Sequence, residues 1–110
     1  MNTLSIFIND QLAFEYDRST ELEDQQREFL DKMDLDMQRG LKIEGELISD
    51  PDSKQKATFV TMNLLRAMQQ EDHLRINVNC AYLSDRLPLV VEVHARDRDN
   101  SIDIEFVEAH

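Results

Sequence analysis

Three aspartates, Asp31, Asp34 and Asp36, form the densest group of possible metal ligands in the sequence. Asp34 and Asp36 are spaced like the first two ligands of a calcium-binding loop. Such a loop also needs glycine at its sixth position and a bidentate glutamate at its twelfth. Those positions hold Arg39 and Gly45, so the loop is incomplete. The favoured interpretation is the solvated face of a helix, and a small enzyme or metal-dependent accessory that uses these carboxylates is the alternative.

Cys80 and His73 are the only pair of residues that suggests a nucleophile and its base. On one helix their spacing places them about 10 Å apart along the axis, which is too far for the hydrogen bond that activates a thiolate. The apolar neighbours of Cys80 instead predict a buried and unreactive thiol. His73, His94 and His110 lack the spacing of a zinc site, and His94 is expected on the outward face of a strand.

The chain has 2 glycines, Gly40 and Gly45. Their spacing is close to that of a phosphate-binding loop, but the Lys-Ser or Lys-Thr pair that such a loop requires does not follow them. The glycine pattern of a dinucleotide-binding turn is also absent. The sequence therefore predicts no cofactor and no catalytic residues, and it favours a non-enzymatic protein.

Length and charge limit the class of protein that this chain can be. A chain of 110 residues suits a single domain, 1–110, and 41% hydrophobic residues are enough for a packed core. A net charge of −11 argues against binding to nucleic acid or anionic lipid, because phosphate contacts need lysine and arginine. Acidic surfaces most often serve solubility, and a nucleic-acid mimic that binds a basic protein is the sharper alternative.

The expected location is cytoplasmic. Cys80 is the single cysteine and cannot form an internal disulfide, which fits a reducing compartment. The first residues lack a basic leader, and the apolar runs are shorter than the roughly 20 residues that cross a bilayer, so no membrane contact is expected.

Charge also divides the chain into zones. Residues 51–88, between the two prolines, have a formal charge of +1, whereas residues 1–50 carry −8 and residues 89–110 carry −4. Burial would produce such a near-neutral stretch. We therefore expect the first half of this stretch to be the central, most contacted element of the fold.

A β-hairpin is predicted at each end of the chain. Apolar and polar residues alternate in residues 4–8 and 12–16 around a turn-prone Asn-Asp-Gln, and again in 89–95 and 102–107 around a polar loop. Alternation is expected to give each of three strands one apolar face: Leu4, Ile6 and Ile8; Leu12, Phe14 and Tyr16; Leu89, Val91, Val93 and Ala95. Phe7 falls on the other face of the first strand, where it is either covered or available to a partner.

An amphipathic helix is predicted over residues 21–39. Its apolar residues recur every three or four positions, and Thr20 followed by Glu23 has the spacing of a capping box. Gly40 is a natural stop for this helix. Residues 41–49, which contain Gly45, are expected to be an irregular connector.

Two further helices are predicted after Pro51. Asp50 is expected to cap a helix over residues 52–70, with Pro51 at its first position. Residues 73–87 carry strand and helix periodicities at once, and their length together with a possible cap at Asp72 favours a helix.

The predicted order is ββαααββ, an α+β domain with helices packed on an antiparallel sheet. Apolar residues that lie off the main stripes, together with the acidic cluster, suggest a partner surface: Phe7, Asp31, Asp34, Leu35, Asp36 and Phe59. A homodimer would be the economical partner, and an exposed strand edge would offer a second route to association. The favoured function is a small acidic protein-interaction or regulatory domain that self-associates, with a basic protein as a possible partner.

Overall fold

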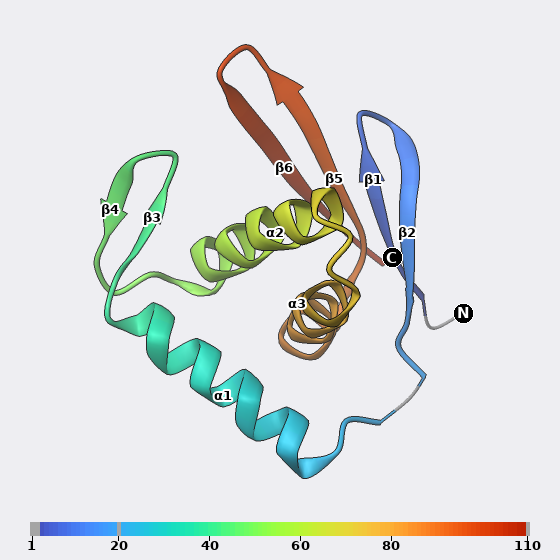
Figure 1. The fold of residues 1–110 in the computed structure, drawn as a ribbon, viewed down its shortest axis with the longest axis vertical. Helices are drawn as coiled ribbons and strands as arrows, with labels where there is room; N and C mark the ends of the chain where they lie inside the picture. Colours follow the sequence, from blue (N-terminus) through green and yellow to red (C-terminus); the bar gives the residue numbers. More distant parts are fainter. Residues whose placement is uncertain (1–2, 20, 110) are drawn as a thin grey trace.

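A computed structural model of the chain describes residues 3–19 and 21–109. Thr20 and His110, for which a cap and a scattered histidine were expected, lie outside these residues. In the described part of the chain, three helices and six strands follow one another (Figure 1): β1 (Thr3–Ile8), β2 (Gln11–Asp17), α1 (Asp24–Gln38), β3 (Leu41–Ile43), β4 (Glu46–Ile48), α2 (Ser53–Gln69), α3 (His73–Arg86), β5 (Val90–Arg98) and β6 (Ser101–Glu108). The α+β class and the main order ββαααββ are thereby confirmed.

The two terminal hairpins join into one four-stranded sheet of order β2-β1-β5-β6. Each hairpin is antiparallel internally, but β1 and β5 run parallel, with Ile6 opposite Val93. The sheet is therefore mixed, and the expectation of a wholly antiparallel sheet is wrong at this central pair. Parallel neighbours need a long crossover connection, and here the three helices and the small β3–β4 hairpin supply it.

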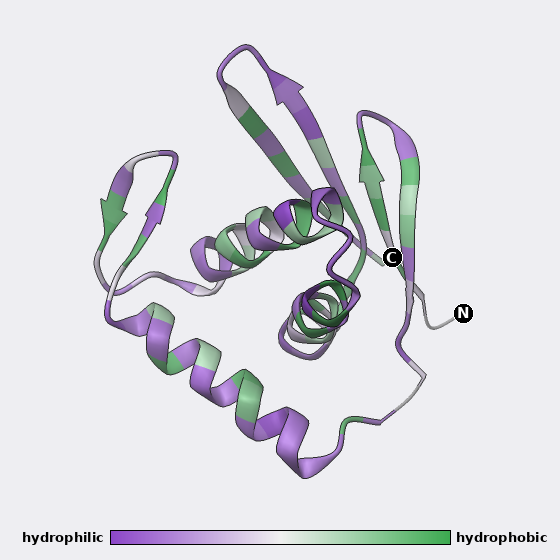
Figure 2. Ribbon diagram, in the orientation of Figure 1, coloured by the Kyte–Doolittle hydropathy of each residue, from purple (hydrophilic) through white to green (hydrophobic). Residues whose placement is uncertain are grey.

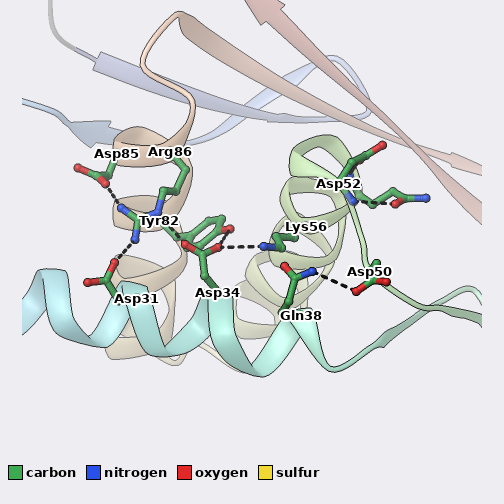
Figure 3. A network of polar contacts seen from close by, with 10 residues as sticks. Asp31, Asp34, Gln38, Asp50, Asp52, Lys56, Tyr82, Asp85 and Arg86 are labelled. Carbon is green, nitrogen blue, oxygen red and sulfur yellow. Dashed lines mark hydrogen bonds and ion pairs between the residues drawn. The ribbon is translucent and has the colours of Figure 1, made fainter.

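Three layers build the molecule. Helices α2 and α3 lie side by side on one face of the sheet, and α1 crosses them on the side away from the sheet (Figures 1 and 3). Helix α2 is central, as expected, and its buried residues are Ala57, Val60, Thr61, Leu64, Leu65 and Ala67. Helix α1 is hydrophilic over most of its length (Figure 2), and it buries Leu30 and Met37. No helix of the described residues is long and apolar enough to span a membrane.

Two bulges shift the faces of the strands. Ala13 is an extra residue between the pairs Ile6–Phe14 and Phe7–Leu12, so Leu12 shares the open face of the sheet with Phe7 and is half exposed. The prediction that Leu12 lies with Phe14 and Tyr16 is therefore wrong.

Val91 forms the second bulge. It is an extra residue between the pairs Val90–Glu108 and Glu92–Val107. This bulge buries Val90 and leaves Leu89 exposed, so the expected face that contained Leu89 and Val91 is also corrected. In both strands one inserted residue breaks the strict alternation of faces on which the sequence prediction depends.

Each helix starts at a side chain that pairs with free backbone amides. Glu23 caps α1, and its N–H donates to Gln26 Oε1 at 2.8 Å. Asp52, and not Asp50 as predicted, caps α2, because its carboxylate accepts from the N–H of Gln55 at 2.8 Å. The Gln55 amide oxygen in turn accepts from the N–H of Asp52 at 2.9 Å, and this reciprocal pair places the helix start two residues later.

The start of α3 is as expected. Asp72 accepts from the N–H of Arg75 at 3.3 Å, which confirms the predicted cap and the helix.

A short hairpin, β3–β4, replaces the irregular connector expected over residues 41–49. Its two turn residues, Glu44 and Gly45, have positive φ of 50° and 84°, which is the geometry of the tight turns that suit β-hairpins. Leu41 is buried beside α2, so the hairpin is anchored at its base.

Replacement of Leu64 by alanine tests the central position of α2. Leu64 is fully buried, and we expect Leu64→Ala to lower the free energy of unfolding by about 2–5 kcal/mol, because the lost contacts leave a cavity. Leu35→Ala on α1 is the matched control, since Leu35 is 66% exposed, and it should change stability by no more than about 0.5 kcal/mol. Urea unfolding followed by circular dichroism measures both, and equal losses would contradict the central position of α2.

Candidate interaction site

Two aspartates of α1, Asp31 and Asp34, face the other two helices (Figure 3). The Asp34 carboxylate accepts a hydrogen bond from the Tyr82 hydroxyl and another from Arg86 Nε at 2.9 Å, and Lys56 Nζ lies 3.8 Å from it. The side chains of Asp34 and Arg86 are both 29% exposed, so this pair is partly shielded from water. One carboxylate therefore ties α1 to both α2 and α3.

Arg86 is the common partner of three acids. Besides Asp34 it binds Asp31 through Nη2 at 2.7 Å and the neighbouring Asp85 through Nη1. The fork of an arginine suits such multiple carboxylate contacts. The structure thus brings Asp31 and Asp34 together around a cation of the same chain.

Asp36 lies apart from this network. It lines a groove between the β3–β4 hairpin and α2, together with Phe59 and Met62. Among the described residues, no group of three or more histidine, cysteine, aspartate or glutamate side chains is placed to hold a metal ion. The three aspartates therefore contribute a structural ion-pair network and one groove residue.

Both tyrosines of the chain are held in their neutral form. Burial, followed by the hydrogen bond to Asp34 and its negative charge, raises the pKa of Tyr82 well above 10, against the opposite effect of Arg86. Burial also raises the pKa of Tyr16. The Asp34 contact explains the larger shift, because a carboxylate so close opposes a second negative charge.

The tyrosine contacts predict loss of stability in alkali. A phenol whose pKa is higher in the folded state contributes full stability below its unfolded pKa near 10, and that contribution is lost as the pH rises through the folded value. We expect tyrosinate absorbance near 295 nm to appear in the folded protein only at a pH clearly above 10. Tyr82→Phe should remove part of the fall in unfolding free energy between pH 9 and 11. Titration of both phenols at the pH of free tyrosine would contradict the contacts.

Arg18, which follows β2, binds the C-terminal end of α3 and the residues after it. Its Nε donates to Ser84 Oγ at 3.0 Å, and its Nη2 reaches the carbonyl oxygens of Leu87 and Pro88 at 3.2 and 3.0 Å. Nη1 donates to the carbonyl oxygen of Val90. Desolvation lowers the pKa of Arg18, but it stays charged at neutral pH. Sequence reasoning missed this residue, because an arginine just after a strand gives no local sign of a partner about 70 residues away.

Replacement of Arg18 by lysine tests this contact. Lysine keeps the charge but cannot make the parallel contacts of a guanidinium, so several carbonyl groups, most of them partly buried, would lose their donors. We expect Arg18→Lys to lower the free energy of unfolding by roughly 1–3 kcal/mol. Arg39→Lys, at an exposed position just after α1, is the control and should leave stability unchanged. A loss as small as that of the control would show that Arg18 does not support the chain between α3 and β5.

Cys80 is fully buried, as predicted. Burial raises the pKa of its thiol to about 12, so almost none of it is thiolate at neutral pH. His94 lies on the open face of the sheet, also as predicted, and its ring stacks on Phe7 with centroids 4.5 Å apart. The contact half buries Phe7, one of the predicted partner residues.

The other predicted apolar residues do not form one surface. Leu35 is exposed as a single residue on α1, whereas Phe59 packs partly against the core. Phe29 of α1 and Leu74 of α3 are large apolar residues, yet they are 51% and 76% exposed. They line two adjoining grooves between α1 and α3, of about 420 and 640 Å³. The periodicity of the helices could not show this, because it does not reveal how much of an apolar stripe a neighbouring helix covers.

Strand β6 ends the sheet with an open edge. The N–H of Ile102 points away from β5, since it donates to Glu44 Oε1 at 3.1 Å. Backbone amides of alternate residues point to the same side of a strand, so those of Ile104 and Phe106 also face outward. The pairing of Ala95 with Ile104 supports this direction. The Ala95 carbonyl oxygen accepts from the N–H of Asn9 at 2.8 Å, so it points toward β1 and away from β6. No strand of the described residues pairs with this outer edge.

The described surface thus offers two features to a macromolecule, the β6 edge and the groove beside Phe29 and Leu74. No family model matches the chain, and neither a curated protein nor a solved structure shows significant similarity to it.

Proposed function

We propose that this chain is a non-enzymatic protein-interaction domain that forms a homodimer by antiparallel pairing of its β6 strands. The observation that carries the proposal is that the amides of Ile104 and Phe106 on β6 face outward, next to the Ile102 amide that Glu44 binds. Unpaired strand edges are templates for pairing with another chain, and main-chain hydrogen bonds would supply the affinity. The single, buried Cys80 supports a reducing, cytoplasmic location for such a domain.

The side chains of β6 lack the usual protection of an edge strand. Natural edges are blocked by lysine, proline, bulges or uncompensated charge. Residues 101–108 contain no lysine, proline or glycine, and the acids of their open face are compensated by the neighbouring strand. Arg96 pairs with Glu105 at 3.3 Å, and Arg98 pairs with Asp103.

The opposite edge of the sheet is less suited to pairing. Strand β2 carries the bulge at Ala13, which interrupts a regular ladder. Its open face also carries Glu15, for which no ion pair is found among the described residues. Two β2 edges side by side would therefore place uncompensated carboxylates near each other, which opposes association.

A pair of β6 strands would satisfy the geometry of a twofold dimer. The same edge on both copies forms the interface, as a closed symmetric dimer requires. Ile102, Ile104 and Phe106 lie on the helix side of the sheet and are only partly buried in one copy. Their counterparts in a second copy would cover them, so backbone pairing and apolar burial would act together.

Ile104→Pro tests the dimer, because it removes an outward amide without breaking the ladder to β5. We expect this variant to remain folded and to be a monomer in sedimentation equilibrium at tens of micromolar, where the parent chain is a dimer. Ile104→Val is the matched control, since valine and proline have similar size but valine keeps the amide. It should stay dimeric.

Two results would overturn the proposal. One is a parent chain that remains monomeric at hundreds of micromolar. The other is an Ile104→Pro variant that is folded, by circular dichroism, and as dimeric as Ile104→Val. If Ile104→Pro does not fold, Ile104→Lys serves in its place, because a charge on the interface side of the edge also opposes pairing.

A further inference from the structure

The groove beside Phe29 and Leu74 has a chemistry unlike the rest of the surface. It lies where α1, the end of α2 and the start of α3 meet, and its apolar lining is Phe29, Met33, Ala67, Leu74 and Val78. A second groove continues from it along α1 and α3 toward Tyr16, and the two share Phe29, Leu74 and Val78. Together they form an apolar depression where α1 crosses α3, which an amphipathic helix of a partner can cover with its apolar side.

Both charged residues that line the first groove are arginines, Arg66 and Arg75. No carboxylate of the described residues lines it, although the chain carries 23 acids against 12 bases, and Asp17 lines the second groove. Asp72 lies 3.4 Å from Arg75 Nε and offsets part of the positive charge. The first groove is thus an apolar site whose charged lining residues are both cations, on a protein of net charge −11.

Both guanidinium groups retain free donors. Arg66 makes only a long contact to Asn63 Oδ1 at 3.4 Å. Arg75 Nε lies 3.4 Å from Asp72, and its side chain is 72% exposed. Neither is bound as Arg86 is by Asp31, Asp34 and Asp85. A carboxylate that approaches either group can therefore make the charge-assisted hydrogen bonds that the chain itself leaves unused.

We propose that this groove binds an amphipathic helix of a partner protein whose apolar side covers Phe29 and Leu74 and whose flanking carboxylates bind Arg66 and Arg75. Apolar burial supplies the affinity, and the two arginines select acidic over basic helices. The surface shares no residue with the β6 edge, so it would serve a partner other than the second copy of the dimer. The groove would thus prefer an acidic partner, whereas most of the acidic surface would prefer a basic one.

Two synthetic peptides of about 16 residues provide the probes. Both carry leucine at positions i, i+3, i+4 and i+7 to form an apolar side. One has glutamate at the flanking positions and the other has lysine. Titration into ¹⁵N-labelled protein, followed by amide chemical shifts, should show the glutamate peptide binding at residues of α1 and α3 around the groove. We expect its affinity to be at least tenfold higher than that of the lysine peptide, although the net charge of the protein favours the lysine peptide.

Substitutions inside and outside the groove distinguish binding in the groove from non-specific electrostatic attraction. Arg66→Gln together with Arg75→Gln should lower the affinity for the glutamate peptide at least tenfold. Arg39→Gln together with Lys42→Gln changes the net charge equally outside the first groove and should have no effect. Leu74→Ala should also weaken binding, with Leu35→Ala as its exposed control.

Three results of the peptide titration would overturn the inference: equal or tighter binding of the lysine peptide, no binding of the glutamate peptide at 1 mM, or shifts confined to residues outside the groove. A Leu74→Ala variant that loses the dimer in sedimentation would show that a second copy occupies the groove, and it would also overturn the inference. Because the dimer is tested at Ile104 and the groove at Arg66, Arg75 and Leu74, failure of one proposal is distinguishable from failure of the other.

Discussion

Helix α2 has apolar side chains on more than one side, and the need to cover all of them shapes the rest of the molecule. Val60 and Leu64 are excluded from water, and even the hydroxyl of Thr61 is buried, where it donates to the carbonyl oxygen of Ala57 at 2.8 Å. A sheet can cover only one side of such a helix. The neighbour α3 and the crossing helix α1 cover the others, which accounts for three layers in a chain of 110 residues.

The acidic helix α1 can occupy the outer layer because its charges are compensated where it meets the inner helices. A half-buried carboxylate such as Asp34 would be costly without partners, and Tyr82, Lys56 and Arg86 provide them. Partial burial alone lowers the pKa of Arg86, but the contacts with Asp34 and Asp85 raise it overall, so the cation of the network is secure at any physiological pH. Arg18 has a comparable role at the same C-terminal end of α3, with carbonyl groups in place of carboxylates.

The same arrangement leaves two surfaces that the rest of the described chain covers only in part, since Glu44 binds one outward amide of β6, that of Ile102. A four-stranded sheet has two edges. Arg96 and Arg98 compensate the carboxylates of β6, so the β6 edge is better suited to pairing than the β2 edge. Helix α1 crosses α3 at an angle and does not run alongside it (Figure 3), so Phe29 and Leu74 remain beside a groove that the chain does not fill. Both proposed interaction sites thus follow from the way in which three helices cover one face of one small sheet.

The sequence by itself determined the local structure and the position of the core. Alternation in the terminal segments predicted both hairpins, the spacing of apolar residues predicted three helices, and the near-neutral charge of residues 51–88 correctly predicted a buried α2. Where the pattern failed, an inserted residue or a tight turn was responsible. The bulges at Ala13 and Val91 turned neighbouring side chains to the other face, and the tight turn at Glu44 and Gly45 made a hairpin of an apparent connector.

Only the tertiary structure decided which side chains meet. Asp34 and Arg86 lie 52 residues apart in the chain. Nothing in the local sequence distinguishes the Asp34 carboxylate from that of Asp36 on the same helix. For the same reason the predicted partner surface was dispersed. Phe7 stacks on His94, Phe59 packs against the core, and Phe29 is exposed. Periodicity records which face of an element is apolar, but the angles at which elements cross determine how much of that face is covered.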